Sequence, residues 1–402
     1  MRKSRLMGPF RPFVLRQWNA RELLALLRSN SPCSRADLVR LSGLSAPTVS
    51  STIEALEKKN LVERLGPGAS NGGRRPDMLR FNSKYGFVAG VDIGGSSLRL
   101  ALADLDGTIL GRWTANTRVH RTPAKIVDLI HKGMSELLRQ QGLSDRHLLA
   151  IAAGAPGVTD VKRGVVISAP HLMDWDNVPL RSLLENRFKV PAVVENDVNA
   201  AAVGERWRGA AQGVDDFVFL AIGTGIGAGL FIRAELYHGA DWSAGEVGYL
   251  LVPGTRATSV ALDKPGALET LIGGHGIERA WRKACEAAGS KNKLDPNLRP
   301  TQVFALAESG NPIANKILTE AAQILGDAIS NISVLLNSSL VVLGGGIGTS
   351  QPLFEEVRYL LENNEFARPR LAITTLGEDA QLYGVVRLAL DRVEETLFAA
   401  SK

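Results

Sequence analysis

The feature that most restricts the fold of this chain is a repeated pattern in which an apolar strand leads into a turn rich in glycine. The first copy is the strand Phe87–Ile93 followed by Gly94 and Gly95, and the second is Phe217–Ile222 followed by Gly223–Gly227. The two turns begin 129 residues apart, and a further apolar segment after each one predicts a return strand. This spacing predicts two related sheets, each opening with a glycine hairpin, with a cleft between them.

A third glycine turn, Gly344–Gly346, follows the apolar segment Leu340–Leu343. Glycine has no Cβ, so turns of this kind allow backbone amides to approach a phosphate group closely. Asp92 precedes the first turn and could hold a Mg²⁺–phosphate complex through ordered water. Each turn alone is weak support, because tight hairpins need glycine in any case. Together with the aspartate, the turns favour a cleft of nucleotide-binding origin. The residues predicted to face phosphate are Asp92, Gly94, Gly95, Ser96, Gly223, Thr224, Gly225 and Gly345.

The sequence Glu195-Asn196-Asp197 forms a dense group of polar side chains between a predicted strand, Pro191–Val194, and a predicted helix, Val198–Arg208. A carboxamide and a carboxylate at the carboxyl end of a strand can bind adjacent sugar hydroxyls. The carboxylate can also act as a general base on a hydroxyl. The alternative is that Asp197 only caps the helix, and the residue chemistry alone does not decide between the two.

Charge is distributed unevenly along the 402 residues, whose formal net charge is +6. Residues 1–84 contain 16 Lys and Arg against 6 Asp and Glu, whereas the remainder contains 31 against 35. A basic segment before a mildly acidic body predicts a polyanionic partner for the N-terminal part. A solvated tail is the alternative, but this segment also has the hydrophobic periodicity of helices.

Three amphipathic helices are predicted in the basic segment: residues 20–30, a helix capped by Ser34, and a third capped by Ser45. Gly43 separates the second and third helices, as in a helix-turn-helix whose second helix enters the major groove of DNA. Two strands around a glycine-rich tip at residues 61–81 then predict a winged hairpin. A generic helical bundle with a solvated hairpin is the alternative. The residues predicted to contact DNA are Ser45, Thr48, Ser50, Ser51, Arg74 and Arg75.

Several other classes of protein are disfavoured. No apolar run reaches the roughly 18 residues that a membrane span needs. The basic N-terminus lacks the apolar core of an export signal. Cys33 and Cys285 are too few for a disulfide framework or a four-thiolate zinc site. We therefore expect a cytoplasmic multidomain protein that does not bind membranes. An RNA-binding scaffold is remote, because nothing resembles an aromatic platform for stacked bases.

Taken together, these motifs resemble those of the ROK family (repressors, open reading frames and kinases), in its NagC/Mlc/XylR repressor branch. The resemblance extends from about residue 19 to residue 395 and is specific in the combination of its motifs. It implies a multidomain α+β protein, in which a winged helix-turn-helix precedes a two-lobed α/β body of the sugar-kinase/actin-like (RNase H-like) ATPase fold. The motifs are Ser34–Leu38, Gly43–Ser45, Thr48–Ser50, Gly73–Pro76, Val91–Gly95, Gly154–Gly157, Glu195–Ala200, Gly223–Gly227 and Gly344–Gly346.

Carried over position by position, the resemblance implies that sugar hydroxyls are bound by Asn196, Asp197, Glu246 and Glu269. Asp197 would be the catalytic base only if kinase activity persists. Tyr249 stands where the family has a histidine that contacts sugar and binds zinc, and we keep this tyrosine as a candidate sugar contact. Outside these motifs, Trp175 could offer an apolar ring face to a sugar, although an ordinary surface loop is at least as good an interpretation.

Two departures from the family bear on cofactors. Residues 260–267 align with the cysteine-rich zinc segment of the family but contain no cysteine, so we expect no zinc site. Ser96 and Ser97 stand where kinase members usually have Thr followed by Lys or Asn. This change removes an ammonium or amide group that could engage phosphate, but it does not exclude phosphoryl transfer.

The predicted organisation is a DNA-binding domain at residues 1–84 and a sugar-kinase-like domain at residues 85–402. Within the second domain, lobe one is expected at 85–200 with a C-terminal helix at 380–400, and lobe two at 201–379. We predict a sugar-responsive transcriptional regulator, most simply a repressor, that binds operator DNA as a homodimer or homotetramer and needs no cofactor. The alternative is an ATP-dependent sugar kinase with a retained DNA-binding head, which would use Mg-ATP.

Overall fold

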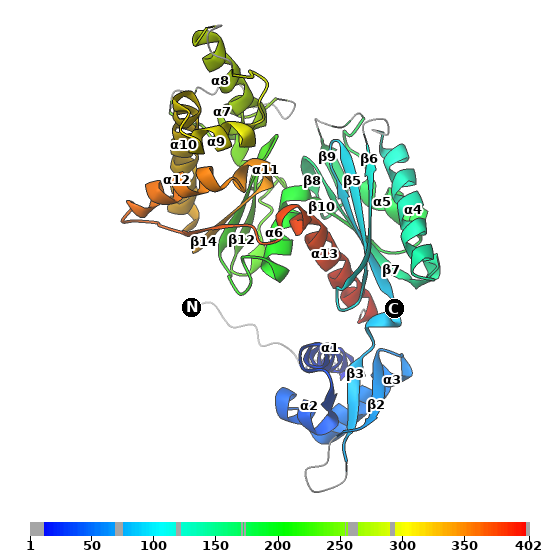
Figure 1. Ribbon diagram of the computed structural model, residues 1–402. Helices are drawn as coiled ribbons and strands as arrows, with labels where there is room; N and C mark the ends of the chain where they lie inside the picture. The colour runs from blue at the N-terminus through cyan, green and yellow to red at the C-terminus, as the bar shows by residue number, and fades with distance from the viewer. Residues whose placement is uncertain are drawn as a thin grey trace, which may run out of the picture.

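The computed structural model of the chain describes residues 12–68, 75–117, 122–169, 172, 174–253, 255, 264–289 and 294–398. Figure 1 shows a small N-terminal domain attached to a larger body, which contains two β-sheets with helices on their faces.

The N-terminal domain consists of three helices and a small antiparallel sheet. Its elements are α1 (Pro12–Asn30), β1 (Cys33–Ser34), α2 (Arg35–Ser42), α3 (Ala46–Lys58), β2 (Val62–Pro67) and β3 (Asp77–Phe81). The predicted caps are confirmed: Ser34 and Asp37 form a capping box at the start of α2, and the hydroxyl of Ser45 accepts a hydrogen bond at the start of α3. Gly43, with φ 69°, ends α2. The sheet has the order β1-β3-β2, and the pairing of β1 with β3 is not predicted by the sequence pattern.

The core of this domain comes from one apolar face of each helix. Leu23, Leu27, Leu38, Val49 and Ile53 are completely buried. Burying an aliphatic side chain of this size contributes roughly 1.5–3 kcal/mol, compared with typically about 1 kcal/mol for a helix cap. The spacing of Val49 and Ile53 turns the short polar residues of α3 toward the opposite side of the helix.

The first sheet of the body has the strand order β10-β7-β4-β5-β6. β4 pairs antiparallel with β5 and parallel with β7. Helices α4 and α5 cover one face of this sheet, whereas the C-terminal helix α13 covers the other. Their bounds are β4 (Phe87–Ile93), β5 (Ser97–Asp104), β6 (Ile109–Asn116), α4 (Pro123–Gln140), β7 (Leu148–Ala155), α5 (Leu180–Phe188), β10 (Ala192–Asn196) and α13 (Ala380–Leu397).

The second sheet has the order β13-β12-β11-β14-β15 and repeats the strand directions of the first. Its hairpin β11–β12 is antiparallel, and β14 lies parallel to β11 as β7 does to β4. The predicted duplication is therefore confirmed. The return strand after the second turn already begins at Ile226, so the open part of the turn is shorter than predicted. The strands are β11 (Phe217–Ile222), β12 (Ile226–Ile232), β13 (Glu235–Leu236), β14 (Leu340–Gly344) and β15 (Arg370–Ile373).

Helices cover the outer face of the second sheet, and a small hairpin lies beside the first (Figure 1). The helices are α7 (Ala267–Ile272), α8 (Gly274–Ala287), α9 (Pro300–Glu308), α10 (Pro312–Leu336), α11 (Gly345–Gly348) and α12 (Gln351–Glu362). The hairpin consists of β8 (Val158–Asp160) and β9 (Val165–Ser168). Two short 3₁₀ turns are Val247–Tyr249 (η3), which follows β13, and Gly377–Asp379 (η4), which precedes α13.

Helix α6 (Asp197–Arg208) lies between the two sheets and crosses α13 at very close range. A Cβ on Gly204 would lie 2.0 Å from the carbonyl oxygen of Ala380, and a Cβ on Gly384 would lie 1.6 Å from that of Ala200. Real Cβ atoms do not approach an oxygen this closely, so the crossing requires glycine at both positions. The backbones of α6 and α13 are thus in direct contact, and neither helix can move far without the other.

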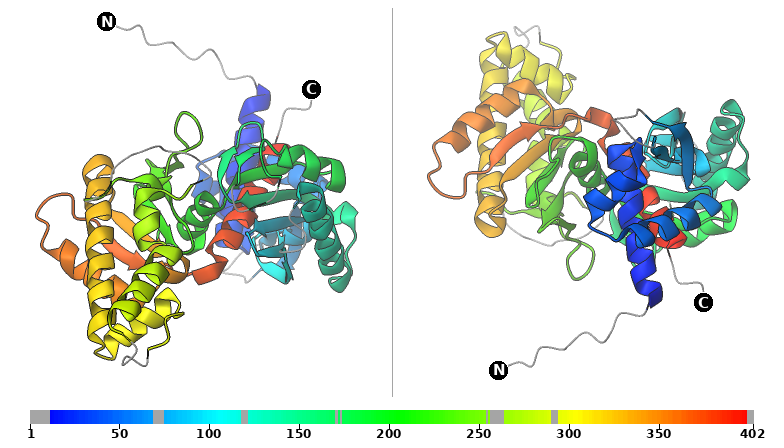
Figure 2. Two further views of the ribbon diagram at one scale, coloured as in Figure 1. Left: turned by 90° about the horizontal axis from the view of Figure 1, so that it is seen from above. Right: turned by 90° about the horizontal axis from the view of Figure 1, so that it is seen from below.

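The C-terminal half of α13 also supports the N-terminal domain. Arg28 of α1 forms an ion pair with Glu394 of α13 and lies over the ring of Phe81 at 4.3 Å. Arg21 lies 5.6 Å from the ring of Phe398, just beyond the end of α13. Both views in Figure 2 place α1 beside α13. No helix in the described part of the chain is long and apolar enough to cross a membrane.

Candidate functional site

A cavity of about 750 Å³ lies between the two sheets, and it gathers almost all of the predicted site. It is lined by the β4–β5 turn, the first turn of α6, the β11–β12 turn and the segment between β13 and α7. Asp92 is the one predicted sugar or phosphate residue that does not line the cavity. The predicted residues that line it are Gly94, Gly95, Ser96, Asn196, Asp197, Gly223, Thr224, Gly225, Glu246, Tyr249, Glu269 and Gly345.

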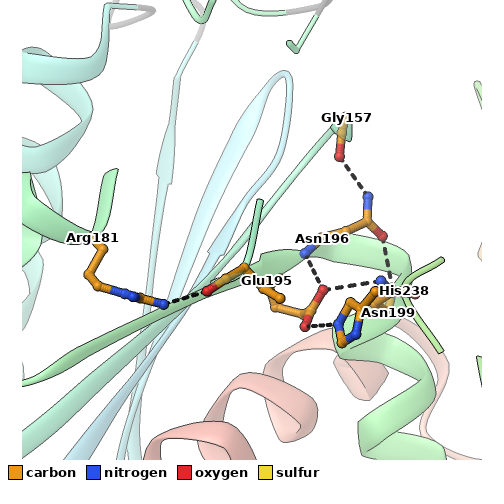
Figure 3. Close-up of polar contacts among 7 residues, drawn as sticks. Gly157, Arg181, Glu195, Asn196, Asn199 and His238 are labelled. Atoms are coloured by element: carbon orange, nitrogen blue, oxygen red, sulfur yellow. Dashed lines mark hydrogen bonds and ion pairs between the residues drawn. The ribbon is translucent and has the colours of Figure 1, made fainter. Parts of the chain in front are cut away.

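Asn196, rather than Asp197, caps helix α6. Its Oδ1 atom accepts a hydrogen bond from the backbone nitrogen of Asn199 at 3.0 Å, and its Nδ2 atom donates to the carbonyl of Gly157 at 2.9 Å. Figure 3 shows the carboxamide reaching from the helix start to this glycine. The alternative that Asp197 caps the helix is therefore wrong: the cap belongs to Asn196, and Asp197 lines the cavity, where its role toward a sugar stays a prediction.

Asp197 is the first residue of α6, and its Oδ1 atom accepts a hydrogen bond from the backbone nitrogen of Val198 at 2.8 Å. Burial and the nearby carboxylates of Asp92 and Glu246 nevertheless raise the pKa of Asp197 to about 7. The hydrogen bond from Val198 acts in the opposite direction but is outweighed. A carboxylate with this pKa can accept a hydrogen bond or a proton from a hydroxyl group near neutral pH.

Glu246, just before η3, and Glu269, in α7, add two carboxylates from the second lobe. Burial, and then the charge of Glu269, raise the pKa of Glu246. The Oε2 atom of Glu269 accepts a hydrogen bond from the backbone nitrogen of Ile226 at 3.0 Å, which ties this side chain to the β11–β12 turn. The hydroxyl of Tyr249 donates to the carbonyl of Lys264 at 3.0 Å. The cavity therefore offers several oxygen acceptors to a polyhydroxy ligand.

The glycine turns use some of their own amides internally. The nitrogen of Gly94 donates to the carbonyl of Ser97 at 2.8 Å, and that of Gly223 donates to the carbonyl of Gly225 at 3.0 Å. Gly345 has φ 78°, and a Cβ there would lie 2.5 Å from the carbonyl oxygen of Ile222. Glycine is required at that position for packing as well as for any approach of a phosphate.

Asp92 is engaged in an ion-pair network behind the cavity. Its Oδ2 atom lies 2.5 Å from Nη2 of Arg99, and it also accepts from Nε of the same guanidinium at 2.6 Å. Arg112 binds Asp379 at 3.0 Å on the far side of Arg99. Burial raises the pKa of Asp92, and the charge of Arg99 partly offsets this effect. The carboxylate predicted to hold a Mg²⁺–phosphate complex is thus already neutralised by an arginine.

Comparison with known proteins shows which family has this arrangement. A model of the ROK family matches residues 88–392, which include both sheets and the cavity. The chain belongs to the ROK family. A model of the MarR family also matches residues 18–75, within the N-terminal domain.

Individual ROK proteins resemble the chain over most of its length. The xylose repressor of Caldicellulosiruptor bescii is 26% identical over 386 residues, which cover 94% of this chain and 96% of that protein. The glucokinase of Halalkalibacterium halodurans is 32% identical over 310 residues, covering 74% of this chain and 93% of that protein. A solved ROK family transcriptional regulator, a homologue of the E. coli MLC protein, has a TM-score of 0.79 at 22% identity and covers 96% of this chain and 98% of that chain. The predicted fold, a helix-turn-helix before a ROK body, is confirmed.

The DNA-facing candidates lie on the free side of α3. Ser45 and Ser51 are exposed, whereas Thr48 and Ser50 are half-buried. The Oγ of Ser45 and the Oγ1 of Thr48 are 2.8 Å apart, so these two hydroxyls also take part in the helix cap. Arg75 is exposed two residues before β3, the second wing strand. Arg74 lies outside the described residues.

Metal binding receives no support from the described side chains of this ROK protein. They contain no group of three or more His, Cys, Asp or Glu placed to hold a metal ion. Half of the segment aligned with the zinc motif, residues 260–263, lies outside the described part of the chain. The expectation that the protein needs no zinc therefore stays a prediction.

The interpretation of one aromatic residue changes, and the structure adds another aromatic residue to the site. Trp175 is 1% exposed and packs in the core of the first sheet, so the prediction that its ring could face a sugar is wrong, although the residues on either side of it are exposed in a loop. Trp242 lines the cavity instead, four residues before Glu246. The sequence pattern does not identify Trp242 or its neighbour His238, because neither belongs to a family motif. The only sequence signal is a tryptophan close to a predicted sugar-binding glutamate.

Proposed function

We propose that this ROK protein is a sugar-responsive transcriptional repressor of carbohydrate-utilisation genes. The observation that carries the proposal is that one chain joins a basic, capped helix-turn-helix to a cavity lined by Asn196, Asp197, Glu246 and Glu269. The first part suits operator DNA, and the second suits the hydroxyl groups of a sugar. The name of the Caldicellulosiruptor bescii relative makes xylose the first sugar to test.

The DNA partner is double-stranded operator DNA, which places the proposed function in the cytoplasm. Helix α3 enters the major groove, and Arg74 and Arg75 reach the phosphate backbone or the minor groove beside it. A homodimer or homotetramer presents two such helices to the half-sites of a pseudo-palindromic operator. Sedimentation of the protein with and without operator DNA measures this assembly, and a monomer on DNA would contradict it.

Sugar and DNA are coupled through two helices. A sugar bound at the start of α6 favours one angle between the sheets, and the contact at Gly204 and Gly384 transmits a change of that angle to α13. The ion pair of Arg28 with Glu394 then carries it to the N-terminal domain. Such coupling requires that the sugar bind the DNA-competent and DNA-released states with different affinity.

The test is a titration of the full-length protein against DNA from upstream of its own gene and of adjacent sugar-utilisation genes. It is carried out at several salt concentrations, with and without a panel of neutral sugars. We expect selective, salt-dependent binding that one sugar shifts. Asp197→Ala should remove the sugar response and leave operator binding intact. Equal sugar sensitivity in wild type and variant would contradict the assignment of the cavity.

A sugar kinase is the second candidate, favoured by one observation: the pKa of Asp197, raised to about 7, suits a general base on a sugar hydroxyl. The ion pair of Asp92 with Arg99 argues against it, because this carboxylate is not free to position Mg²⁺. Incubation with Mg-ATP and the same sugar panel separates the two candidates. If the protein phosphorylates a sugar and no sugar changes its binding to the operator, the kinase would be favoured over the repressor.

A further inference from the structure

Trp242 occupies a strained position in the wall of the cavity. It lies between β13 and η3, and it lines the cavity together with Asn196 and Asp197. Its backbone is in the left-handed region, with φ 64°. A bulky L-residue seldom adopts this conformation, which costs roughly 1–2 kcal/mol. Contacts with surrounding residues must therefore stabilise this backbone conformation and the position of the indole.

His238 makes one of these contacts and is itself held by Glu195. Its ring meets the ring of Trp242 edge-on, with centroids 5.6 Å apart and planes at 65°. Its Nε2 atom lies 2.8 Å from Oε2 of Glu195, a carboxylate that is only 4% exposed. His238 belongs to the second sheet's side of the cavity and Glu195 to the first. This contact therefore joins the two sides, as Figure 3 shows for His238 and Glu195.

Glu195 is in turn connected to the predicted sugar-binding end of α6. Its Oε1 atom accepts hydrogen bonds from the backbone nitrogen of Asn196 at 2.9 Å and from Nδ2 of Asn199 at 3.1 Å. We call Glu195, His238 and Trp242 the clasp. Because the clasp is bonded to the residues beside Asp197, the indole and the sugar-binding groups are held in one connected unit.

The walls of the cavity are chemically uneven. Asp197, Glu246 and Glu269 contribute carboxylates, and the raised pKa values of the first two indicate that additional negative charge there is unfavourable. Trp242 contributes a flat apolar surface whose ring face carries negative potential. A pyranose has the matching surfaces, since its hydroxyls project around the ring edge while weakly positive C–H groups cover a ring face.

We propose that Trp242 is a specificity-determining residue for a neutral, unphosphorylated pyranose, whose C–H face packs on the indole. His238 and Glu195 are positioning residues that hold the indole against the ligand. This inference rests on the proposed function, because it names the chemical class of the effector that enters the same cavity. It assigns a role to three residues that the family motifs leave without one.

The test compares full-length wild type with Trp242→Ala and Trp242→Phe, and with Trp18→Phe as the control. Trp18 is 67% exposed on α1, far from the cavity lining. Each protein is titrated calorimetrically with xylose, glucose, N-acetylglucosamine and glucose 6-phosphate. We expect wild type to bind a neutral pyranose more tightly than the phosphate ester. Trp242→Ala should weaken that binding at least tenfold, Trp242→Phe less, and Trp18→Phe not at all.

Three outcomes overturn the inference: equal affinity in Trp242→Ala and wild type, tighter binding of glucose 6-phosphate, or binding of none of the four compounds. The proposed function is judged separately, by operator binding measured on the same samples. If wild type binds its operator and any of these compounds shifts that binding, the repressor stands even when Trp242 proves irrelevant. If no compound shifts operator binding, the proposed function itself fails.

The positioning role of His238 has its own readout. His238→Ala should lower sugar affinity and shift the indole emission of the sugar-free protein, because Trp242 loses its edge-on neighbour. In a Trp242→Phe background the same substitution should leave the emission unchanged. His238→Gln keeps an amide that can donate to Glu195 and should recover part of the affinity. An emission shift that persists in the Trp242→Phe background, or no shift at all, overturns the positioning role.

Discussion

Replacing Asp197 by Asn should stabilise the sugar-free protein at alkaline pH while abolishing its response to sugar. Asn keeps an oxygen for the hydrogen bond from Val198 and has nearly the same shape, but it carries no charge. The substitution therefore removes the ionised carboxylate from a site where burial and two other carboxylates oppose it. The free energy of unfolding should therefore rise, while the affinity for sugar falls.

The magnitude follows from the pKa of Asp197, which is about 7 in the folded protein against an ordinary value of 3.8. A folded-state pKa above the unfolded value means that the associated stability is fully present below pH 3.8 and is lost as the pH rises through 7. Each pKa unit corresponds to about 1.4 kcal/mol, so at pH 8 the charged carboxylate destabilises the fold by up to about 4 kcal/mol. At pH 5 the same relation leaves less than half of this effect.

The assay is thermal and denaturant unfolding of wild type and Asp197→Asn at pH 8 and pH 5, without sugar. Asp176→Asn is the matched control, because Asp176 is exposed in a loop of the first lobe and its substitution should change stability at neither pH. The reasoning is refuted if Asp197→Asn is no more stable than wild type at pH 8. A gain of the same size at both pH values would also refute it, since the effect would then not come from ionisation.

Three further predictions concern other parts of the molecule. Joint replacement of Arg74 and Arg75 by Ala should weaken operator binding and flatten its dependence on salt, and an unchanged salt slope in binding titrations would count against the wing. Gly384→Ala should lower the melting temperature strongly, by a free energy of roughly 3 kcal/mol or more, because the new Cβ meets the carbonyl oxygen of Ala200 at 1.6 Å. Its control, Gly346→Ala, has no atom within 4 Å of the new Cβ, so equal losses in the two variants would argue against the close helix crossing. Elemental analysis of purified protein should find no stoichiometric zinc. One zinc ion per chain would contradict the inference that the loss of cysteine from residues 260–267 removes the zinc site.

Local signals in the sequence were sufficient for the elements that contain them. Ser34 and Gly43 determine where α2 begins and ends, and Ser45 determines where α3 begins, through short-range hydrogen bonds and backbone conformation. The glycine turns at 94 and 223 likewise predict two hairpins, and the two sheets then repeat one strand order. These features are predictable because each depends on residues that are neighbours in the chain.

Features that depend on distant residues were not predictable in this way. Arg99 faces Asp92 because β4 and β5 pair in register, and His238 contacts Glu195 from a segment 43 positions away in the sequence. Neither contact has a local signature. The burial of Trp175 was not predictable for the same reason, because this loop residue is buried by residues that are distant in the sequence.

The contrast between Asp92 and Asp197 indicates how a kinase-like cleft can serve a repressor. Asp92 is buried and forms an ion pair with an arginine, whereas burial and the charges of Asp92 and Glu246 raise the pKa of Asp197, which is only half-buried. On the phosphate side, the carboxylate of Asp92 is thereby held in an internal ion pair with Arg99. On the sugar side, Asp197 keeps an unfavourable negative charge that a hydrogen bond from a ligand hydroxyl can stabilise. A group whose charge is poorly satisfied without ligand gains most from binding one, so it favours the sugar-bound arrangement of the sheets over the empty one. Because Asp197 is the first residue of α6, and α6 contacts α13 backbone to backbone, that preference acts on the helix that supports the DNA-binding domain.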